Sequence, residues 1–235
     1  MGKILVINEK PDQSKNFVKA LQKEGSFTRN NGYFENDKYV VAFAFGHILS
    51  SKQPSDYEEF GGWKWSAIPF FPPNGDLDYH VSEKSKAPQL KVLGELLKRK
   101  DIDLVVNAAD AGREGELIFW EIYDYYKSKL PVKRLWISSL VEKDILDGFK
   151  NLKDEPFYLP KRAAAYARQY ADWVLGMNLT VGFSIKANMG RALHVGRVQT
   201  PTVAILVQRK QEIENFKSED YFEIEAEFGA KYKGK

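Results

Sequence analysis

Apolar residues recur along this chain with two different periods, and the period switches between strand and helix several times. Short apolar runs at 3–7 and 104–106 predict strands that are buried on both faces, as in parallel sheets. Each run is followed by a short polar loop and then by apolar residues at helical spacing, near 17–21 and 118–126. The sequence therefore predicts two strand-to-helix units of the kind found in α/β proteins.

Other segments extend this pattern. Further strands are predicted at Tyr33–Glu35, Tyr39–Ala44 and Lys133–Ile137, with helices at Gln89–Lys98 and Glu142–Lys150. Asn36-Asp37 lies between the first two of these strands and indicates a hairpin. The order predicts a mainly parallel sheet with helices on both faces. The aromatic, Pro/Gly-rich stretch 50–87 is expected to pack over the core as a loop, although interleaved aromatics and lysines also suit base stacking.

The pattern changes at Asp154–Pro160, where two prolines predict a linker and a domain boundary. We expect a domain at 1–153, a mostly α-helical domain at 160–217 and the start of a β-containing domain at 218–235. In the helix 161–179, Tyr166, Tyr170 and Trp173 form a stripe expected to face the core. A second helix begins near Thr200. Its residues expected to be buried are Val203, Leu206, Val207 and Ile213. A strand without a partner at Glu219–Phe228 and a frayed basic tail at 229–235 indicate a chain that continues further.

Composition excludes several classes of protein. The 235 residues are 43% hydrophobic, yet no run reaches the roughly 18 apolar residues of a membrane span, and the N-terminus is too soon polar for a signal peptide. We therefore expect a cytoplasmic protein. The absence of cysteine excludes disulfides and thiolate zinc sites. Net charge is only +3, but between Lys161 and Lys210 eight Lys and Arg residues stand against one acid, Asp172, which suits a phosphate backbone.

Charged residues gather where the two predicted strand-to-helix units turn. Glu9 and Lys10 follow the first strand, and Asp110, Arg113, Glu114 and Glu116 follow the second. Neighbouring parallel strands bring such loops to one edge of a sheet. Carboxylates there suit Mg²⁺, and Arg113 suits a phosphate oxygen. The alternative is an ordinary pair of turns, with acids favoured by the helix dipole. His47 is equally compatible with a nucleic-acid contact and with a packed core histidine.

Several motifs together resemble one family. Asp110-Ala-Gly-Arg-Glu-Gly-Glu116 resembles the acidic motif of the Toprim domain in the form found in type IA DNA topoisomerases, most closely the bacterial topoisomerase III group. The other similar segments are Glu9-Lys10-Pro11, Gly46-His47-Ile48-Leu49, Arg134–Leu140, Ala167–Thr180 and Val195–Thr202 with its Gly-Arg-Val-Gln-Thr-Pro. The departures are Asp12-Gln13, His194 and Gly112, which stands where the Toprim pattern has a second Asp.

This resemblance implies a Toprim-type sheet and single-strand DNA cleavage with Mg²⁺ and without ATP, through a 5′-phosphotyrosine link. Glu9, Asp110 and Glu114 are then the metal ligands, and Glu9, Lys10 and Arg113 the catalytic residues. Arg168, Arg197, Gln199 and Thr200 are the expected DNA-binding residues. Gly112 puts the metal affinity, or the number of ions bound, in question. The implied partner is single-stranded or negatively supercoiled DNA, bound by a monomer.

The attacking tyrosine is expected beyond Lys235, because none of the twelve tyrosines lies in the Tyr-x-Arg-Thr setting of the family. The 235 residues alone are therefore expected to be inactive. Two alternatives remain. One is a Toprim nuclease or primase, which would not share the helical block, and the other is a non-catalytic nucleic-acid-binding module.

Overall fold

The computed structural model describes residues 2–228 and 232–234. Its first part is a seven-stranded sheet with the spatial order β2-β3-β4-β1-β7-β8-β9. The strands are β1 (Lys3–Asn8), β2 (Thr28–Asn30), β3 (Tyr33–Glu35), β4 (Tyr39–Phe43), β7 (Ile102–Asn107), β8 (Val132–Arg134) and β9 (Lys153–Asp154). β1 pairs in parallel with β4 and β7, and β7 pairs in parallel with β8, whereas β2–β3, β3–β4 and β8–β9 are antiparallel. The parallel strands predicted from the sequence are confirmed for the centre of the sheet, which is mixed because its edge strands pair antiparallel.

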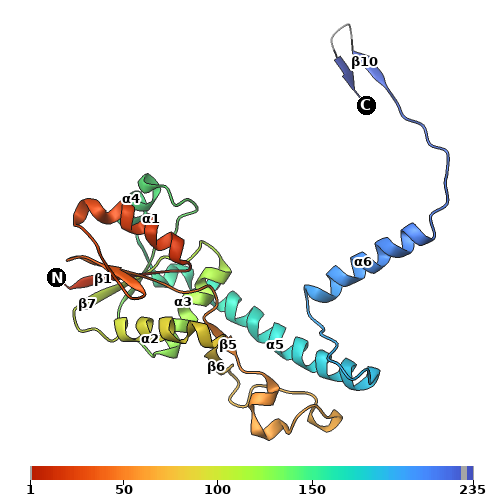
Figure 1. The fold of residues 1–235 in the computed structure, drawn as a ribbon, viewed down its shortest axis with the longest axis horizontal. Coiled ribbons are helices and arrows are strands. Elements are labelled where there is room, and N and C mark those ends of the chain that lie inside the picture. Colours follow the sequence, from red (N-terminus) through yellow and green to blue (C-terminus); the bar gives the residue numbers. More distant parts are fainter. Residues whose placement is uncertain (1, 229–231, 235) are drawn as a thin grey trace.

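Helices cover both faces of this sheet (Figure 1). They are α1 (Pro11–Leu21) and α4 (Glu142–Lys150) on one face, and α2 (Ala87–Leu96) and α3 (Arg113–Tyr125) on the other. Alternation along β1 explains the two layers, because Val6 packs with the α1 and α4 side while Leu5 and Ile7 pack with the α2 and α3 side. All three are buried, and burial of each such side chain is worth about 1.5–3 kcal/mol.

The segment between β4 and α2 packs as expected over the rest of the molecule. It contains the antiparallel pair β5 (Leu49–Ser51) and β6 (Tyr79–Val81) and several single turns of 3₁₀ helix. Phe70 and Tyr57 are buried against Trp173 and Val181 in a separate small core. The prediction of a loop held down by its aromatic residues is confirmed for these side chains, although Trp65 remains 58% exposed.

A single long helix connects the sheet to the second part of the chain. α5 (Leu159–Ala187) has a proline in its first turn and ends at Asn188 in the left-handed conformation. It is longer than the helix 161–179 expected from the sequence. The first half of α5 packs along α3, and Trp173 donates its indole N–H to the backbone oxygen of Lys52, 2.7 Å away. The helix therefore fixes where the second part begins relative to the sheet.

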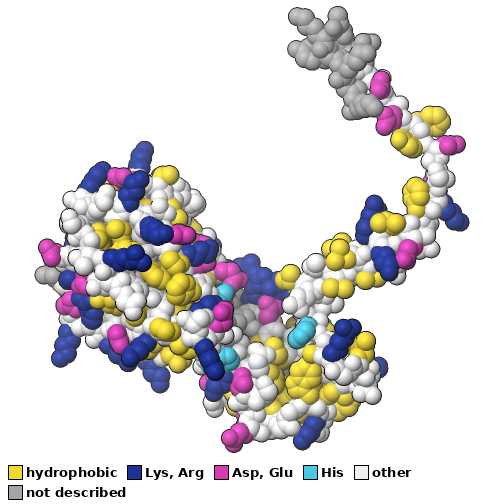
Figure 2. All heavy atoms as spheres, viewed as in Figure 1, with side chains coloured by type: hydrophobic (Ala, Val, Ile, Leu, Met, Phe, Trp, Pro, Cys, Tyr) yellow, Lys and Arg dark blue, Asp and Glu magenta, His cyan; other side chains and the backbone are white. Residues whose placement is uncertain are grey.

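Two expectations for the last part of the chain are wrong. α6 (Gln199–Glu214) forms, but its apolar stripe is not buried, since Leu206 is 66% and Ile213 62% exposed; Val203 and Val207 are exposed too. No residue of this helix is buried, and Figure 2 shows its apolar side chains at the surface. The strand expected at Glu219–Phe228 shortens to β10 (Ala226–Phe228), which pairs with β11 (Tyr232–Gly234). The rest of the predicted basic tail, 229–231 and 235, lies outside the described residues.

Within the described ranges, no helix combines the length and the apolar character that crossing a membrane requires.

Candidate metal and nucleic-acid site

The two charged loops lie side by side at the carboxyl edge of the sheet. β1 and β7 are parallel neighbours with Ile7 opposite Asn107, so the residues that follow each strand meet. Lys10 places its Nζ 3.0 Å from Glu9 Oε1 and 3.3 Å from Asp110 Oδ2. Its hydrogen bonds to these carboxylates, Glu9 first, raise the pKa of Lys10. The expected meeting of the two loops is thus observed, with one cation between two carboxylates.

Gln13 joins the two loops, although the sequence marks it only as part of a departure from the family pattern, with no role at the site. Its amide nitrogen donates to Asp110 Oδ1, while its oxygen accepts from the backbone N–H of Glu9 at 3.0 Å and of Lys10 at 3.1 Å. The available signal was its place in the third position of α1, after Pro11, where Gln commonly closes a capping box. Gln13 therefore orients both the Glu9 backbone and the Asp110 carboxylate.

Buried Arg134 lies beneath the acidic loop, which is the segment between β7 and α3 together with the first turn of α3. Its Nη1 donates to the backbone oxygens of Asn107 at 3.0 Å and Ala109 at 2.7 Å, and its Nη2 donates to that of Asp110 at 2.8 Å. Its Nε lies 2.6 Å from Glu116 Oε1, and both side chains are at most 2% exposed. Glu116, grouped with the loop acids in the sequence, is therefore a buried partner of Arg134 and does not face the loop.

Two glycines of this loop have opposite constraints. A Cβ at Gly115 would lie 2.1 Å from the backbone oxygen of Asp110, so only glycine permits this close approach of loop and helix. A Cβ at Gly112 would meet nothing within 4 Å, and its φ of −172° is extended. The structure therefore has room for a side chain at the position where the Toprim pattern carries its second Asp.

A cleft of about 200 Å³ lies between the acidic loop and the long helix α5. It is lined by residues from both parts of the chain, namely His47, Arg113, Glu114, Leu117, Ala165, Arg168, Gln169, Asp172 and Arg197. Three arginines that the sequence suggested as phosphate contacts thus converge on one opening. They come from the acidic loop, from α5 and from the segment before α6.

Asp172 restrains the arginines on the α5 side of the cleft. It accepts from Arg197 Nε at 2.9 Å and Nη2 at 3.0 Å, and it lies 4.0 Å from Arg168 Nε. The hydrogen bonds from Arg197 are the main reason why the pKa of Asp172 is lowered. Arg197 is about half exposed, so this pair holds its guanidinium at the cleft while leaving it accessible.

His47 lies between two carboxylates of α3. Its Nε2 is 3.2 Å from Glu114 Oε2, and its Nδ1 is 3.7 Å from Glu121 Oε2. Hydrogen bonding with buried Glu121, and then the charges of Glu121 and Glu114, raise the pKa of His47. The side chain is half exposed, so His47 is not a fully packed core histidine, and it keeps Glu114 directed toward the cleft.

The remaining expected site residues are placed differently. Gln199 and Thr200 line a separate, largely apolar hollow next to Phe183, and the hydroxyl of Thr200 accepts the backbone N–H of Gly196 at 3.1 Å. They are therefore not brought to the cleft. Among the residues that the structure describes, no three His, Asp or Glu side chains are close enough together to hold one ion. Glu9 and Asp110 converge on Lys10, whereas Glu114 is directed to His47.

Comparison with known proteins agrees with this geometry. Residues 4–140 match the Toprim domain family, and residues 158–235 match a DNA topoisomerase family. The chain is 39% identical over 234 residues to DNA topoisomerase 3 of Bacillus cereus, covering 99% of this chain and 31% of the relative. It is also 39% identical over 228 residues to DNA topoisomerase 3 of Staphylococcus haemolyticus, covering 97% and 31%. Full-length topoisomerase I from Thermotoga maritima has a similar structure, with a TM-score of 0.59 and 26% identity over 91% of this chain and 31% of that one.

The chain therefore belongs to the Toprim family, and its remaining part, from residue 158 on, matches a DNA topoisomerase family. It spans about 31% of the length of the curated relative from Bacillus cereus. The family implies a requirement for a divalent metal ion. Glu9 and Asp110 fit such an ion, because they already surround the ammonium of Lys10.

The buried pair beneath the acidic loop gives a first prediction. Replacing Arg134 with Met leaves the Glu116 carboxylate buried without its cation, and it removes one hydrogen bond from each of three backbone oxygens, of Asn107, Ala109 and Asp110. We expect the free energy of unfolding to fall by about 3–5 kcal/mol in urea denaturation. The double variant Arg134→Met with Glu116→Met should be less destabilised than the sum of the two single variants.

Lys133→Met is the matched control, since the neighbouring Lys133 is 43% exposed and its ammonium is 3.5 Å from Asp154. Its effect should stay within about 0.5 kcal/mol. Equal losses for Lys133→Met and Arg134→Met would contradict the assigned role of Arg134.

Proposed function

We propose that this chain is the part of a type IA topoisomerase that binds single-stranded DNA and Mg²⁺ at the cleft beside the acidic loop. In the whole protein, cleavage and passage of one strand would follow, through a 5′-phosphotyrosine link and without ATP. The observation that supports this most directly is the convergence of Arg113, Arg168 and Arg197 on one cleft with Glu114. Guanidinium groups suit phosphate oxygens, and carboxylates suit a hard cation.

We propose Mg²⁺ as the ion and Glu9, Asp110 and Glu114 as its ligands. Lys10 now lies between the first two carboxylates, so an ion and the Lys10 ammonium would share one place. A DNA phosphate gives Lys10 another partner, which lets the lysine leave as the ion is bound. Bound Mg²⁺ would supply positive charge beside the reacting phosphate.

The residues of the chain have separate roles in this proposal. Lys10 and Arg113 contact the phosphate that reacts, and Arg168 and Arg197 hold the neighbouring strand. The tyrosine hydroxyl attacks phosphorus, the bond to the 3′ oxygen breaks, and the 3′ oxygen takes up a proton. The tyrosine loses one proton and the 3′ oxygen gains one, and one phosphodiester is exchanged for another, so the reverse step reseals the strand without an added energy source. Phosphate contacts carry no base selectivity, so little sequence preference is expected from these arginines.

The rival functions are less well supported. A Toprim nuclease or primase would share the sheet with its acidic loop, but the match over residues 158–235 is to a DNA topoisomerase family. A non-catalytic binding module would not need Glu9 and Asp110 arranged around one cation. A monomer in the cytoplasm remains our proposal for the assembly and location.

Gly112 provides a direct test of the metal site. Because a Cβ at this position meets no atom within 4 Å, Gly112→Asp has room to add a fourth carboxylate, next to Asp110. We expect the dissociation constant for Mg²⁺, measured by titration calorimetry, to fall about tenfold, which corresponds to about 1.4 kcal/mol. In the unmodified chain, Asp110→Asn and Glu114→Gln should both weaken binding.

Gly112→Asn has nearly the same shape without the charge, so it should change the affinity much less. If the Asn variant binds Mg²⁺ as tightly as the Asp variant, or if Asp110→Asn leaves binding unchanged, the ion is held elsewhere.

The role of the arginines in binding single-stranded DNA can be tested by measuring how the affinity depends on salt concentration. Affinity for single-stranded DNA should fall with added salt, with a log–log slope of about −0.7 for each phosphate neutralised. Arg197→Ala removes one such contact and should make the slope shallower by about 0.7. Fluorescence anisotropy of a labelled oligonucleotide at several salt concentrations measures both quantities.

Arg209→Ala is the control, because Arg209 lies on α6, pairs with Glu212 and does not line the cleft. It removes the same charge from the chain and should leave the slope nearly unchanged. An affinity that does not depend on salt would rule out this mode of binding.

A further inference from the structure

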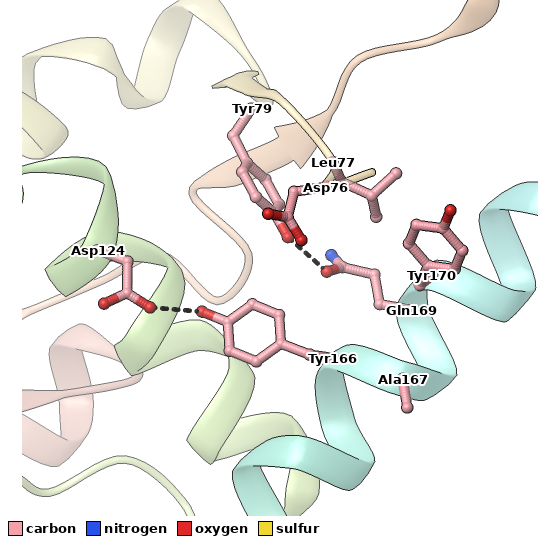
Figure 3. A pocket seen from close by; sticks show the side chains of 8 residues that line it. All are labelled: Asp76, Leu77, Tyr79, Asp124, Tyr166, Ala167, Gln169 and Tyr170. Atoms are coloured by element: carbon pink, nitrogen blue, oxygen red, sulfur yellow. Dashed lines mark hydrogen bonds between the residues drawn. The ribbon is translucent and has the colours of Figure 1, made fainter. Parts of the chain in front are cut away.

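A second space, a cavity of about 530 Å³, lies beside α5 and is separate from the arginine-lined cleft. It is formed by α3, by α5 and by the segment that leads into β6 (Figure 3). The lining residues are Asp76, Leu77, Tyr79, Asp124, Tyr166, Ala167, Gln169 and Tyr170. This volume falls within the range of small-molecule sites, roughly 300–1,000 Å³.

The polar atoms of its walls are mostly paired with one another. Tyr79 donates its hydroxyl to Gln169 Oε1 at 2.7 Å, and Tyr166 donates to Asp124 Oδ2 at 3.0 Å (Figure 3). Gln169 in turn donates its amide to buried Glu121 at 2.6 Å. These hydrogen bonds fix the orientation of two tyrosine rings, so the walls are built before any ligand arrives.

The charge of the cavity has one sign. Asp76 and Asp124 line it from two different elements, and no Lys or Arg belongs to its lining. Asp124 is paired with Arg162 at 2.7 Å, whereas Asp76 has no ion pair or hydrogen bond with a described residue. Burial, and then the charges of nearby carboxylates, raise the pKa of Tyr79 and of Tyr166. The cavity therefore favours a cationic ligand.

We propose that this cavity binds an organic diamine or polyamine. Aromatic rings attract an ammonium group that lies within about 6 Å of the ring centre. The rings of Tyr79, Tyr166 and Tyr170 line the cavity and offer such faces. Asp76 offers an ion pair to one ammonium group, and Asp124, whose Oδ2 already binds Arg162 and Tyr166, offers its other oxygen to the second. Leu77 and Ala167 offer apolar contacts to the methylene chain between the two groups. A divalent metal ion fits less well, because only two carboxylates line the cavity and one of them, Asp124, already pairs with Arg162.

Gln169 places this cavity next to the DNA cleft, since it lines both. Its contact with Glu121, which also lies beside His47, runs between the two spaces. An amine bound at the tyrosines would thus lie one side chain away from the cleft and leave the arginines of the cleft free for phosphate.

The test is titration calorimetry of the chain with putrescine, spermidine, butylamine and Mg²⁺, without DNA and at physiological salt. We expect putrescine and spermidine to bind with one site, and butylamine to bind at least tenfold more weakly because it has a single ammonium group. Asp76→Asn should weaken putrescine binding at least tenfold. Asp78→Asn, two residues away, paired with Lys52 and outside the lining, should change it less than twofold.

Tyr170→Leu serves as a second variant that keeps the apolar volume and removes one ring; we expect at least fivefold weaker binding, with folding checked by circular dichroism. Equal losses for Asp76→Asn and Asp78→Asn would overturn the proposal, because they would indicate only a diffuse attraction of cations. Displacement of putrescine by equimolar Mg²⁺ would overturn it as well, and so would unchanged binding in the folded Asp76→Asn and Tyr170→Leu variants.

Discussion

The acidic loop depends on a buried cation beneath it. Its turns place the backbone oxygens of Ala109 and Asp110 outside the hydrogen-bond ladder of the sheet, and buried polar groups without partners are costly. The Arg134 guanidinium donates hydrogen bonds to these oxygens. Glu116 and the face of the Trp136 ring, whose centre is 4.8 Å from the guanidinium carbon, compensate its charge. Because a planar fork of donors serves three carbonyl oxygens at once, lysine is not an equivalent replacement. The position of Asp110 follows from this pair.

At the surface above Arg134, the carboxylates of the two loops are arranged around a positive charge. Lys10 lies between Glu9 and Asp110, and Gln13 holds both loops from one amide group. Two carboxylates this close repel each other unless a cation lies between them. Lys10 therefore supplies the positive charge that holds Glu9 and Asp110 close together, and in the proposed function the lysine and the metal ion would be alternatives at this place.

The contact between α3 and α5 determines what faces this site. Arg162 stacks on Trp120 at 3.8 Å from the ring centre and pairs with Asp124, so the start of α5 is anchored to the far end of α3. α5 then passes the acidic loop and presents Arg168 and Asp172 to it. One helix–helix contact thus creates two spaces of opposite character, the arginine-lined cleft and the tyrosine-lined cavity, with Gln169 between them.

The sequence by itself determined the local units: the buried strands, the helix Glu142–Lys150 with its observed bounds, the hairpin, and the meeting of the Glu9 and Asp110 loops. These follow from periodicity and from the geometry of neighbouring parallel strands, which act over short stretches of chain. Periodicity also gave one wrong prediction, because the apolar stripe of α6 matches the pattern of a buried helix, yet none of its residues is buried. Only the tertiary structure decided that Glu116 is buried, that Gln13 bridges the loops and that Arg197 pairs with Asp172. Each of those contacts joins residues from different elements, so it depends on how whole elements pack. A charged residue in a loop also gives the same sequence signal whether it faces solvent, a ligand or a buried counter-charge.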